Sequence, residues 1–89
     1  MPKGKILRRV ALQYRNRVRE CRLRAMVPSQ VLLARLTGID KNIINALENN
    51  RIFLSASYAL LISETLGCRL DDLYEKKSIE DERNPHRGE

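Results

Sequence analysis

The chain has 89 residues, a length that supports one domain and is too short for two separate hydrophobic cores. Apolar residues make up 43% of it and aromatic residues 4%, which favours aliphatic side chains packed between helices. The formal net charge of +6 points to an anionic partner, nucleic acid before a membrane surface. No apolar run is long enough for a membrane span, and Arg8 and Arg9 interrupt the one candidate signal peptide. We therefore expect a cytoplasmic protein with no membrane partner.

The positive charge is concentrated toward the amino terminus. Residues 1–24 hold nine Lys or Arg against one acid, whereas residues 25–74 hold four basic and five acidic residues. Attraction to an anion must then come from the amino-terminal segment and a few separate residues, Arg35, Lys41 and Arg51. Charge patterning alone supports a merely solvated basic helix equally well.

Within this basic segment, apolar residues recur at three- and four-residue steps, which predicts a first helix that begins early. They are Ile6, Leu7, Val10, Ala11, Tyr14 and Val18. Residues 1–14 would extend that helix, and the pattern leaves a frayed basic arm open as the alternative. Pro28 blocks continuation of the first helix, and Ser29 is suited to cap the next one.

Residues 30–49 have the pattern of two short helices joined by a tight turn. Residues 30–36 carry apolar residues at Leu32 or Leu33 and at Leu36, three or four positions apart, which places them along one stripe of a helix. Gly38 suits a left-handed helix end. Asp40 can accept hydrogen bonds from the open N–H groups of a second helix.

The second of these helices, residues 40–49, has two different faces. Ile44 and Leu47 fall on one side, with Ile39 anchoring the entry. The other side is polar and rich in amides, and it carries Lys41, Asn42, Asn45 and Asn49. A short helix of this kind, held by a preceding helix across a glycine turn, is suited to the major groove of DNA.

The segment that follows is apolar. Asn50 is an acceptable residue for a left-handed helix end, and Ile52, Phe53 and Leu54 form an apolar loop before Ser55, which can cap another helix.

The carboxy-terminal part is predicted to hold two more helices and a tail. A helix over residues 55–66 ends at Gly67, and Asp71 and Asp72 suit the first turn of a short fifth helix. The residues expected to close the core there are Leu70, Leu73 and Tyr74. Residues 75–89 are charged and almost free of apolar residues, which indicates a solvated tail.

No catalytic constellation is apparent. The only histidine, His86, lies beside Pro85 in the charged tail, and there is no glycine-rich phosphate loop. Cys21 and Cys68 are far apart and have no CxxC spacing. We therefore expect both to be small buried residues of a protein in a reducing compartment. We therefore expect a protein that is not an enzyme and needs no metal or other cofactor.

Together these motifs resemble the Xre-type helix-turn-helix family, the Cro and phage-repressor class of bacterial and phage DNA-binding proteins. The segments that carry the resemblance are 18–22, 30–49, 47–51, 55–66 and 66–74. The resemblance implies an all-α, five-helix, lambda-repressor-like DNA-binding domain over residues 15–74. The extension of the first helix before this domain, and the disordered tail of residues 75–89 after it, are expected from the apolar spacing and the composition of this chain and not from the resemblance.

The resemblance further implies roles for individual residues. Arg22 would pair with Glu48 beneath the recognition helix. Base readout would fall to Lys41, Asn42, Ile43, Asn45 and Ala46. Contacts to phosphates would come from Ser29, Gln30, Asn49 and Arg51. In the family, the residue at the Gln30 position binds either a phosphate or a neighbouring side chain. Lys suits guanine O6 and N7, and Asn suits adenine N6 and N7. Ile43 would either touch a thymine methyl or be shielded by the protein.

In this family the loop after the recognition helix commonly meets a second subunit, so Ile52, Phe53 and Leu54 are candidates for a homodimer contact. Packing of the loop on its own core is the alternative. Val31 and Leu32 stand where the family usually has charged residues, and we expect them to pack against the long first helix. The expected function is a dimeric regulator, a repressor, that binds double-stranded DNA. Two alternatives remain: an antitoxin with a small protein partner, and an adaptor that uses the same fold without specific DNA binding.

Overall fold

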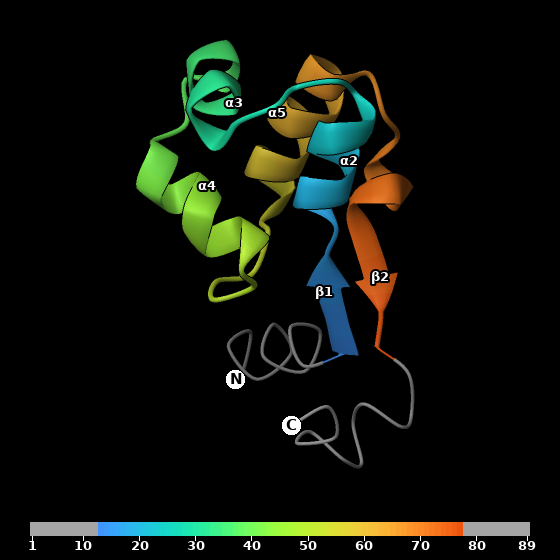
Figure 1. Cartoon of the computed structure of the whole chain (residues 1–89). Coiled ribbons are helices and arrows are strands. Elements are labelled where there is room, and N and C mark those ends of the chain that lie inside the picture. The colour runs from blue at the N-terminus through green and yellow to red at the C-terminus, as the bar shows by residue number, and fades with distance from the viewer. Residues whose placement is uncertain (1–12, 78–89) are drawn as a thin grey trace.

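The computed structural model describes residues 13–77, which form four short α-helices and a two-stranded antiparallel ribbon (Figure 1). In chain order the elements are β1 (Tyr14–Asn16), α2 (Val18–Arg24), α3 (Gln30–Thr37), α4 (Lys41–Glu48), α5 (Ala56–Leu66), the 3-10 helix η1 (Leu70–Leu73) and β2 (Tyr74–Lys76). The helices gather at one end, and the ribbon projects from beneath α2 (Figure 1).

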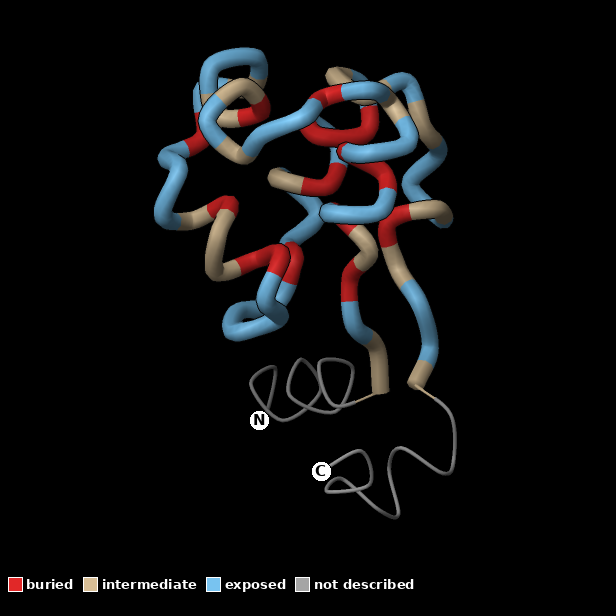
Figure 2. The backbone as a smooth tube through the Cα atoms, viewed as in Figure 1, coloured by how far each residue is buried: buried red, intermediate tan, exposed pale blue. Residues whose placement is uncertain are grey.

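The core lies between the helices and is aliphatic, as the composition predicts. Its largest fully buried side chains come from every helix and from the loop after α4: Val18, Leu33, Ile44, Leu47, Leu54, Ile62 and Leu73. The buried segments of the separate helices face one another in the middle of the bundle (Figure 2). Burial of each such side chain stabilises the fold by roughly 1.5–3 kcal/mol. This packing is what holds helices of seven or eight residues, because helices of that length are marginal by themselves.

The predicted caps set the helix boundaries. Three side chains accept a hydrogen bond from a backbone N–H of the following first turn, at 2.7–3.4 Å: Ser29, Asp40 and Ser55. Gly38 and Gly67 end α3 and α5 in the left-handed region, with φ values of 80° and 70°. These local signals explain why the positions of α3, α4 and α5 agree with the prediction.

The predicted first helix is not continuous in the residues that the structure describes, because Gln13 is helical but a strand separates it from α2. α2 begins at Val18, and Tyr14–Asn16 form β1 instead of a helical turn. Asn16 marks the change, because its side-chain Oδ1 accepts from the Val18 N–H at 3.0 Å while its Nδ2 donates to the Leu47 carbonyl at 2.7 Å. The rest of the predicted extension, residues 1–12, lies outside the described part.

The ribbon corrects the all-α prediction and moves the start of the tail. The paired residues are Tyr14 with Lys76, Arg15 with Glu75, and Asn16 with Tyr74. Residue 75, where the tail is predicted to begin, therefore lies within β2, and residues 78–89 are outside the described part. The predicted fifth helix is the single 3-10 turn η1.

Some apolar residues lie differently from the prediction. Leu36 and Leu70 are exposed, because Leu33 and Leu73 occupy the inward positions of α3 and η1. Val31 is also exposed, and in the described part of the chain no long first helix covers it. α3 therefore exposes two separate apolar side chains, Val31 and Leu36, to solvent.

The two cysteines, 47 positions apart in sequence, lie against the same small cavity of about 210 Å³ between α2 and the end of α5. Both are free thiols, Cys21 buried and Cys68 half-buried. Burial raises the pKa of the Cys21 thiol to about 11, and the neighbouring Cys68 adds to this shift. Cys21 is therefore a protonated core residue at neutral pH, and its Sγ donates to the Asp72 carbonyl at 3.3 Å.

Candidate nucleic-acid interface

The turn between α3 and α4 is fixed at both ends. The Thr37 hydroxyl donates to the Leu33 carbonyl at 2.8 Å and accepts from the Ile39 N–H at 3.1 Å. Ile39 itself is buried in the core. Because Gly38 takes the left-handed conformation between them, α4 leaves the turn in a new direction and packs across α3 (Figure 1).

α4 has one apolar and one polar face, as predicted. Ile44 and Leu47 are fully buried, whereas Lys41 and Asn42 in the first turn are exposed. Within residues 13–77 the side chains of Lys41 and Asn42 have no hydrogen-bond partner. The Asp40 cap accepts from the backbone N–H of Asn42 and leaves its side chain free. Both side chains are thus available to an external partner.

The other candidate base readers are less open. Ile43 is half-buried and packs against the edge of the core, which is the shielded arrangement that the sequence leaves open. Ala46 and Asn45 are also half-buried. The first turn of α4 is therefore its most accessible part.

Beneath α4 lies a buried ion pair, the one that the family resemblance implies. Arg22 donates through Nε to Glu48 Oε2 at 2.7 Å and through Nη2 to Oε1 at 3.2 Å. Burial alone would raise the pKa of Glu48, but hydrogen bonds from Arg22 and Gln30 and the nearby arginine charges outweigh it. The pKa therefore lies below the ordinary value of 4.5, and Glu48 is an anion at neutral pH.

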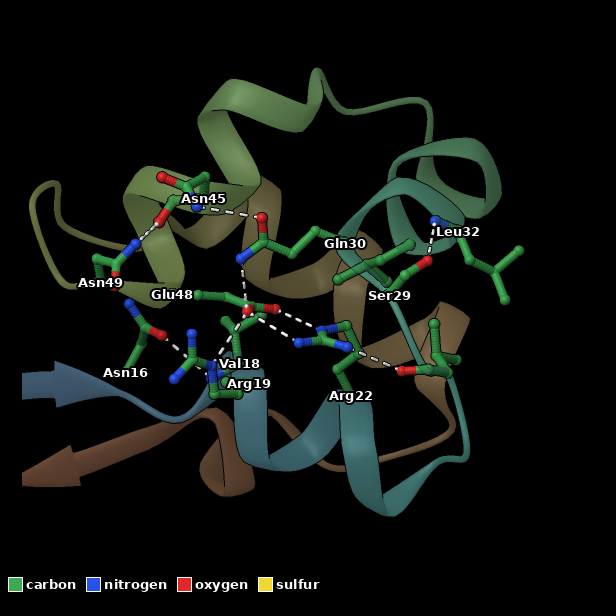
Figure 3. Close-up of polar contacts among 12 residues, drawn as sticks. Asn16, Val18, Arg19, Arg22, Ser29, Gln30, Leu32, Asn45, Glu48 and Asn49 are labelled. Atoms are coloured by element: carbon green, nitrogen blue, oxygen red, sulfur yellow. Dashed lines mark hydrogen bonds and ion pairs between the residues drawn. The ribbon is translucent and has the colours of Figure 1, made fainter.

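Gln30 joins this ion pair to the outer side of α4 (Figure 3). Its Nε2 donates to Glu48 Oε1 at 3.0 Å, and its Oε1 accepts from Asn45 Nδ2 at 3.1 Å. Gln30 thus binds neighbouring side chains at both ends of its amide. The family resemblance allows Gln30 to bind either a phosphate or a neighbouring side chain, and the structure shows the contact to neighbouring side chains.

The remaining candidate phosphate contacts lie at the ends of the two helices. The Ser29 hydroxyl is exposed and accepts from the Leu32 N–H at 3.0 Å. Asn49 is exposed and donates through Nδ2 to the Asn45 carbonyl at 2.9 Å. Arg51 is exposed just after the left-handed end of α4, and its side chain makes no hydrogen bond or ion pair within the described residues.

Arg19, which the sequence patterns do not single out, lies beside the same ion pair. Its Nε is 3.6 Å from Glu48 Oε1, and 57% of its side chain is exposed. The spacing of three residues between Arg19 and Arg22 places both on one side of α2, and this was the available signal. Arg19 adds an exposed positive charge beside the carboxy-terminal half of α4 (Figure 3).

The apolar loop after α4 is divided between the core and the surface. Leu54 is only 1% exposed, and its carbonyl accepts from the Tyr74 hydroxyl at 2.6 Å, so its assignment as a dimer contact is wrong. Ile52 and Phe53 are 43% and 39% exposed. The Phe53 ring lies 6.1 Å from that of Tyr74, centroid to centroid, and this contact joins the loop to the ribbon.

Two short helices held at an angle by a glycine turn, the second with a buried apolar face and an exposed polar one, define a helix-turn-helix domain. The chain belongs to the Xre/Cro-type helix-turn-helix family, because the helix-turn-helix family model matches residues 18–73, more than half of its length. This is a family of DNA-binding regulatory domains. No curated protein and no solved structure gives a significant match.

Among residues 13–77, no helix has the length and apolar character needed to cross a membrane. The same residues contain no cluster of three or more His, Cys, Asp or Glu side chains that could hold a metal ion.

Proposed function

We propose that this protein is a sequence-specific transcription regulator, a repressor, that reads the major groove of double-stranded DNA with α4. The observation that supports this most directly is the contrast between the two faces of that helix. Ile44 and Leu47 fix α4 to the core, while Lys41 and Asn42 extend from its first turn without a side-chain hydrogen-bond partner among residues 13–77. The side chains of an amino-terminal turn are the ones that reach base edges in this type of docking.

Phosphate attraction in this proposal comes from positions around the motif. Exposed cations stand on α2 at Arg19, on α3 at Arg35, and after α4 at Arg51. The basic residues 1–24 provide most of the net positive charge. Such contacts hold the protein in register on the duplex, whereas the first turn of α4 supplies the sequence preference.

A salt titration tests the proposal. Duplexes enriched from a random pool by the full chain are labelled, and the dissociation constant is measured by fluorescence anisotropy from low to moderate salt. A regulator that neutralises about six phosphates gives a log–log slope near −5 and retains a preference for the enriched duplex over a scrambled one. Weak binding without sequence preference would instead identify an adaptor that uses the fold as a scaffold.

The same proposal includes a homodimer on DNA. Ile52 and Phe53 expose apolar surface beside a hollow of about 340 Å³ that is also lined by Tyr14 and Tyr74. We expect a palindromic site, and light scattering should give the mass of two chains on it. At protein concentrations at which wild type binds as two chains, the double variant Ile52→Ser, Phe53→Ser should bind the palindrome as a single chain, and a wild-type mass of one chain on the palindrome would exclude the dimer.

A second candidate function is supported by α3. Val31 and Leu36 are exposed on a helix that the fold does not otherwise cover within the described residues. A small protein partner docked on α3, as in an antitoxin, would bury one or the other of these side chains. Copurification of a small protein partner with the wild type, compared with a Val31→Glu, Leu36→Glu variant, distinguishes this function because the variant should lose the partner and still bind DNA.

A further inference from the structure

The chain of hydrogen bonds from Arg22 to Asn45 has a fixed direction. An ionised carboxylate only accepts hydrogen bonds, and Glu48 is held in that form by its buried arginine. Gln30 must therefore turn its NH₂ group, not its carbonyl, toward Glu48, as it does at 3.0 Å. Rotation of this amide by 180° would place two oxygen acceptors against each other.

The orientation of Gln30 fixes that of Asn45 in turn. With its nitrogen bound to Glu48, Gln30 presents Oε1 to α4, and only a donor can meet it. Asn45 meets it with Nδ2 at 3.1 Å. Its Oδ1 then lies on the side away from Gln30 (Figure 3). Within residues 13–77 this oxygen and the second N–H of the amide have no hydrogen-bond partner.

We infer that Asn45 is a specificity residue that selects a base with a major-groove amino group, adenine or cytosine, because Glu48 acting through Gln30 sets the direction of its amide. This inference rests on the proposed function and assigns a base class to one position of its site. Adenine N6 and cytosine N4 donate to an outward-facing oxygen, whereas guanine and thymine offer only acceptors at the corresponding positions. The remaining Asn45 N–H can reach adenine N7, so adenine satisfies both free groups.

Asn42 provides a contrast on the same helix. Its side-chain amide has no partner within the described residues, so it can turn either its oxygen or its NH₂ toward a base. The two asparagines therefore differ in what they can discriminate. Only Asn45 has lost one of its two orientations before DNA arrives.

The test is a selection from a randomised duplex pool with four full-length proteins: wild type, Asn45→Ala, Gln30→Met and Asn42→Ala. The position read by Asn45 is the one whose preference disappears in Asn45→Ala. Wild type should prefer adenine or cytosine there by about tenfold over guanine or thymine, the discrimination typical of one base contact. Gln30→Met keeps the side-chain length and the Arg22–Glu48 pair but frees the Asn45 amide. It should accept guanine or thymine at that position and leave the other positions unchanged.

The matched control is Asn42→Ala, which should alter a different position and leave the Asn45 position intact. Thermal unfolding of all four proteins confirms that they are folded, and Gln30→Ala replaces Gln30→Met should the latter unfold. A wild-type preference for guanine or thymine at the Asn45 position would overturn the inference and leave the proposed function standing. So would an unchanged preference in the Gln30 variants. Failure of wild type to enrich any sequence would instead refute the proposed function, and the inference with it.

Discussion

The two halves of α4 both carry polar side chains but hold them differently. In the first turn, Lys41 and Asn42 have no partner among the described residues. In the second half, Asn45 and Glu48 belong to one continuous set of hydrogen bonds that reaches Arg22 in α2. A free side chain loses rotamer entropy when it binds DNA, whereas a side chain that is already held has lost it on folding. One short helix thus combines an adaptable part and a pre-oriented part.

This difference has a consequence for how stability and recognition are related. Glu48 holds α2 against α4 and also orients the amides of Gln30 and Asn45. Changes in the second half of α4 should therefore affect both unfolding and base preference. Changes in the first turn should affect DNA binding alone, and variants at the two ends can separate these effects.

The largest expected effect is the loss of stability in Arg22→Ala. Removal of the guanidinium leaves the Glu48 carboxylate buried without its main partner, which costs about 3–5 kcal/mol in the free energy of unfolding. Urea denaturation of the wild type and the variant measures it. Arg19→Ala is the matched control, because Arg19 contacts the same carboxylate at 3.6 Å from an exposed position and should change stability by less than about 1 kcal/mol. Equal losses in the two variants would contradict a buried pair.

Acid should give a graded form of the same effect. The pKa of Glu48 is lowered in the folded state relative to the ordinary value of 4.5, so its ionisation favours folding above that pH. This contribution should disappear as the pH falls below 4.5 and through the lower folded-state pKa. Urea denaturation of wild type and Glu48→Gln across this range isolates it, because the glutamine cannot titrate. The wild-type advantage should be constant at neutral pH and shrink in acid, and a gap independent of pH would refute the assignment.

The first turn should show the opposite behaviour. Lys41→Ala and Asn42→Ala should each relax the preference at one base position, at a cost of about 1–3 kcal/mol in binding, with unfolding unchanged. Arg51→Ala should weaken all sequences alike, since its proposed contact is to phosphate. Dissociation constants for the enriched duplex and a scrambled one measure both effects. The same loss on both duplexes for all three variants would remove the distinction between base and phosphate contacts.

The motif itself could be predicted from sequence because its determinants are local. Ser29, Gly38 and Asp40 fix the helix ends through contacts within a few residues, and the apolar spacing identifies the buried face of α4. The hydrogen bonds that join Glu48 through Gln30 to Asn45 could be predicted only in part. The family resemblance pairs Arg22 with Glu48, but the contact between Gln30 and Asn45 depends on the angle at which α3 and α4 cross.

The ribbon escaped prediction because nothing local encodes it. Each strand has three residues, too few for an alternating pattern, and Tyr14 finds its partner at Lys76. Tyr14 and Val18 do have helical spacing in the sequence. The chain is nevertheless extended between them, because the Asn16 side chain donates a hydrogen bond to the Leu47 carbonyl in α4. A short-range pattern was thus outweighed by contacts made across the fold.

The smallest expected effect is at the carboxy-terminal end of α4, next to its hydrogen-bonded second half. Asn50 ends the helix in the left-handed region with φ of 55°, and its Oδ1 accepts from the backbone N–H of Asn16 at 2.9 Å. Met26 takes the same conformation after α2, with φ of 66°, but is 85% exposed. The two positions thus share their backbone conformation and differ in what the side chain does.

Substitution by glycine separates these factors. Met26→Gly removes the strain of a left-handed side chain and should raise the free energy of unfolding by about 0.5 kcal/mol, after the entropy that glycine adds to the unfolded chain. Asn50→Gly gains less, because asparagine tolerates this conformation, and it loses the bond to Asn16, so it should lower stability by about 1 kcal/mol. Denaturation midpoints measured side by side give the signs. Two variants that shift in the same direction would show that the backbone, and not the Asn50 side chain, holds the end of α4.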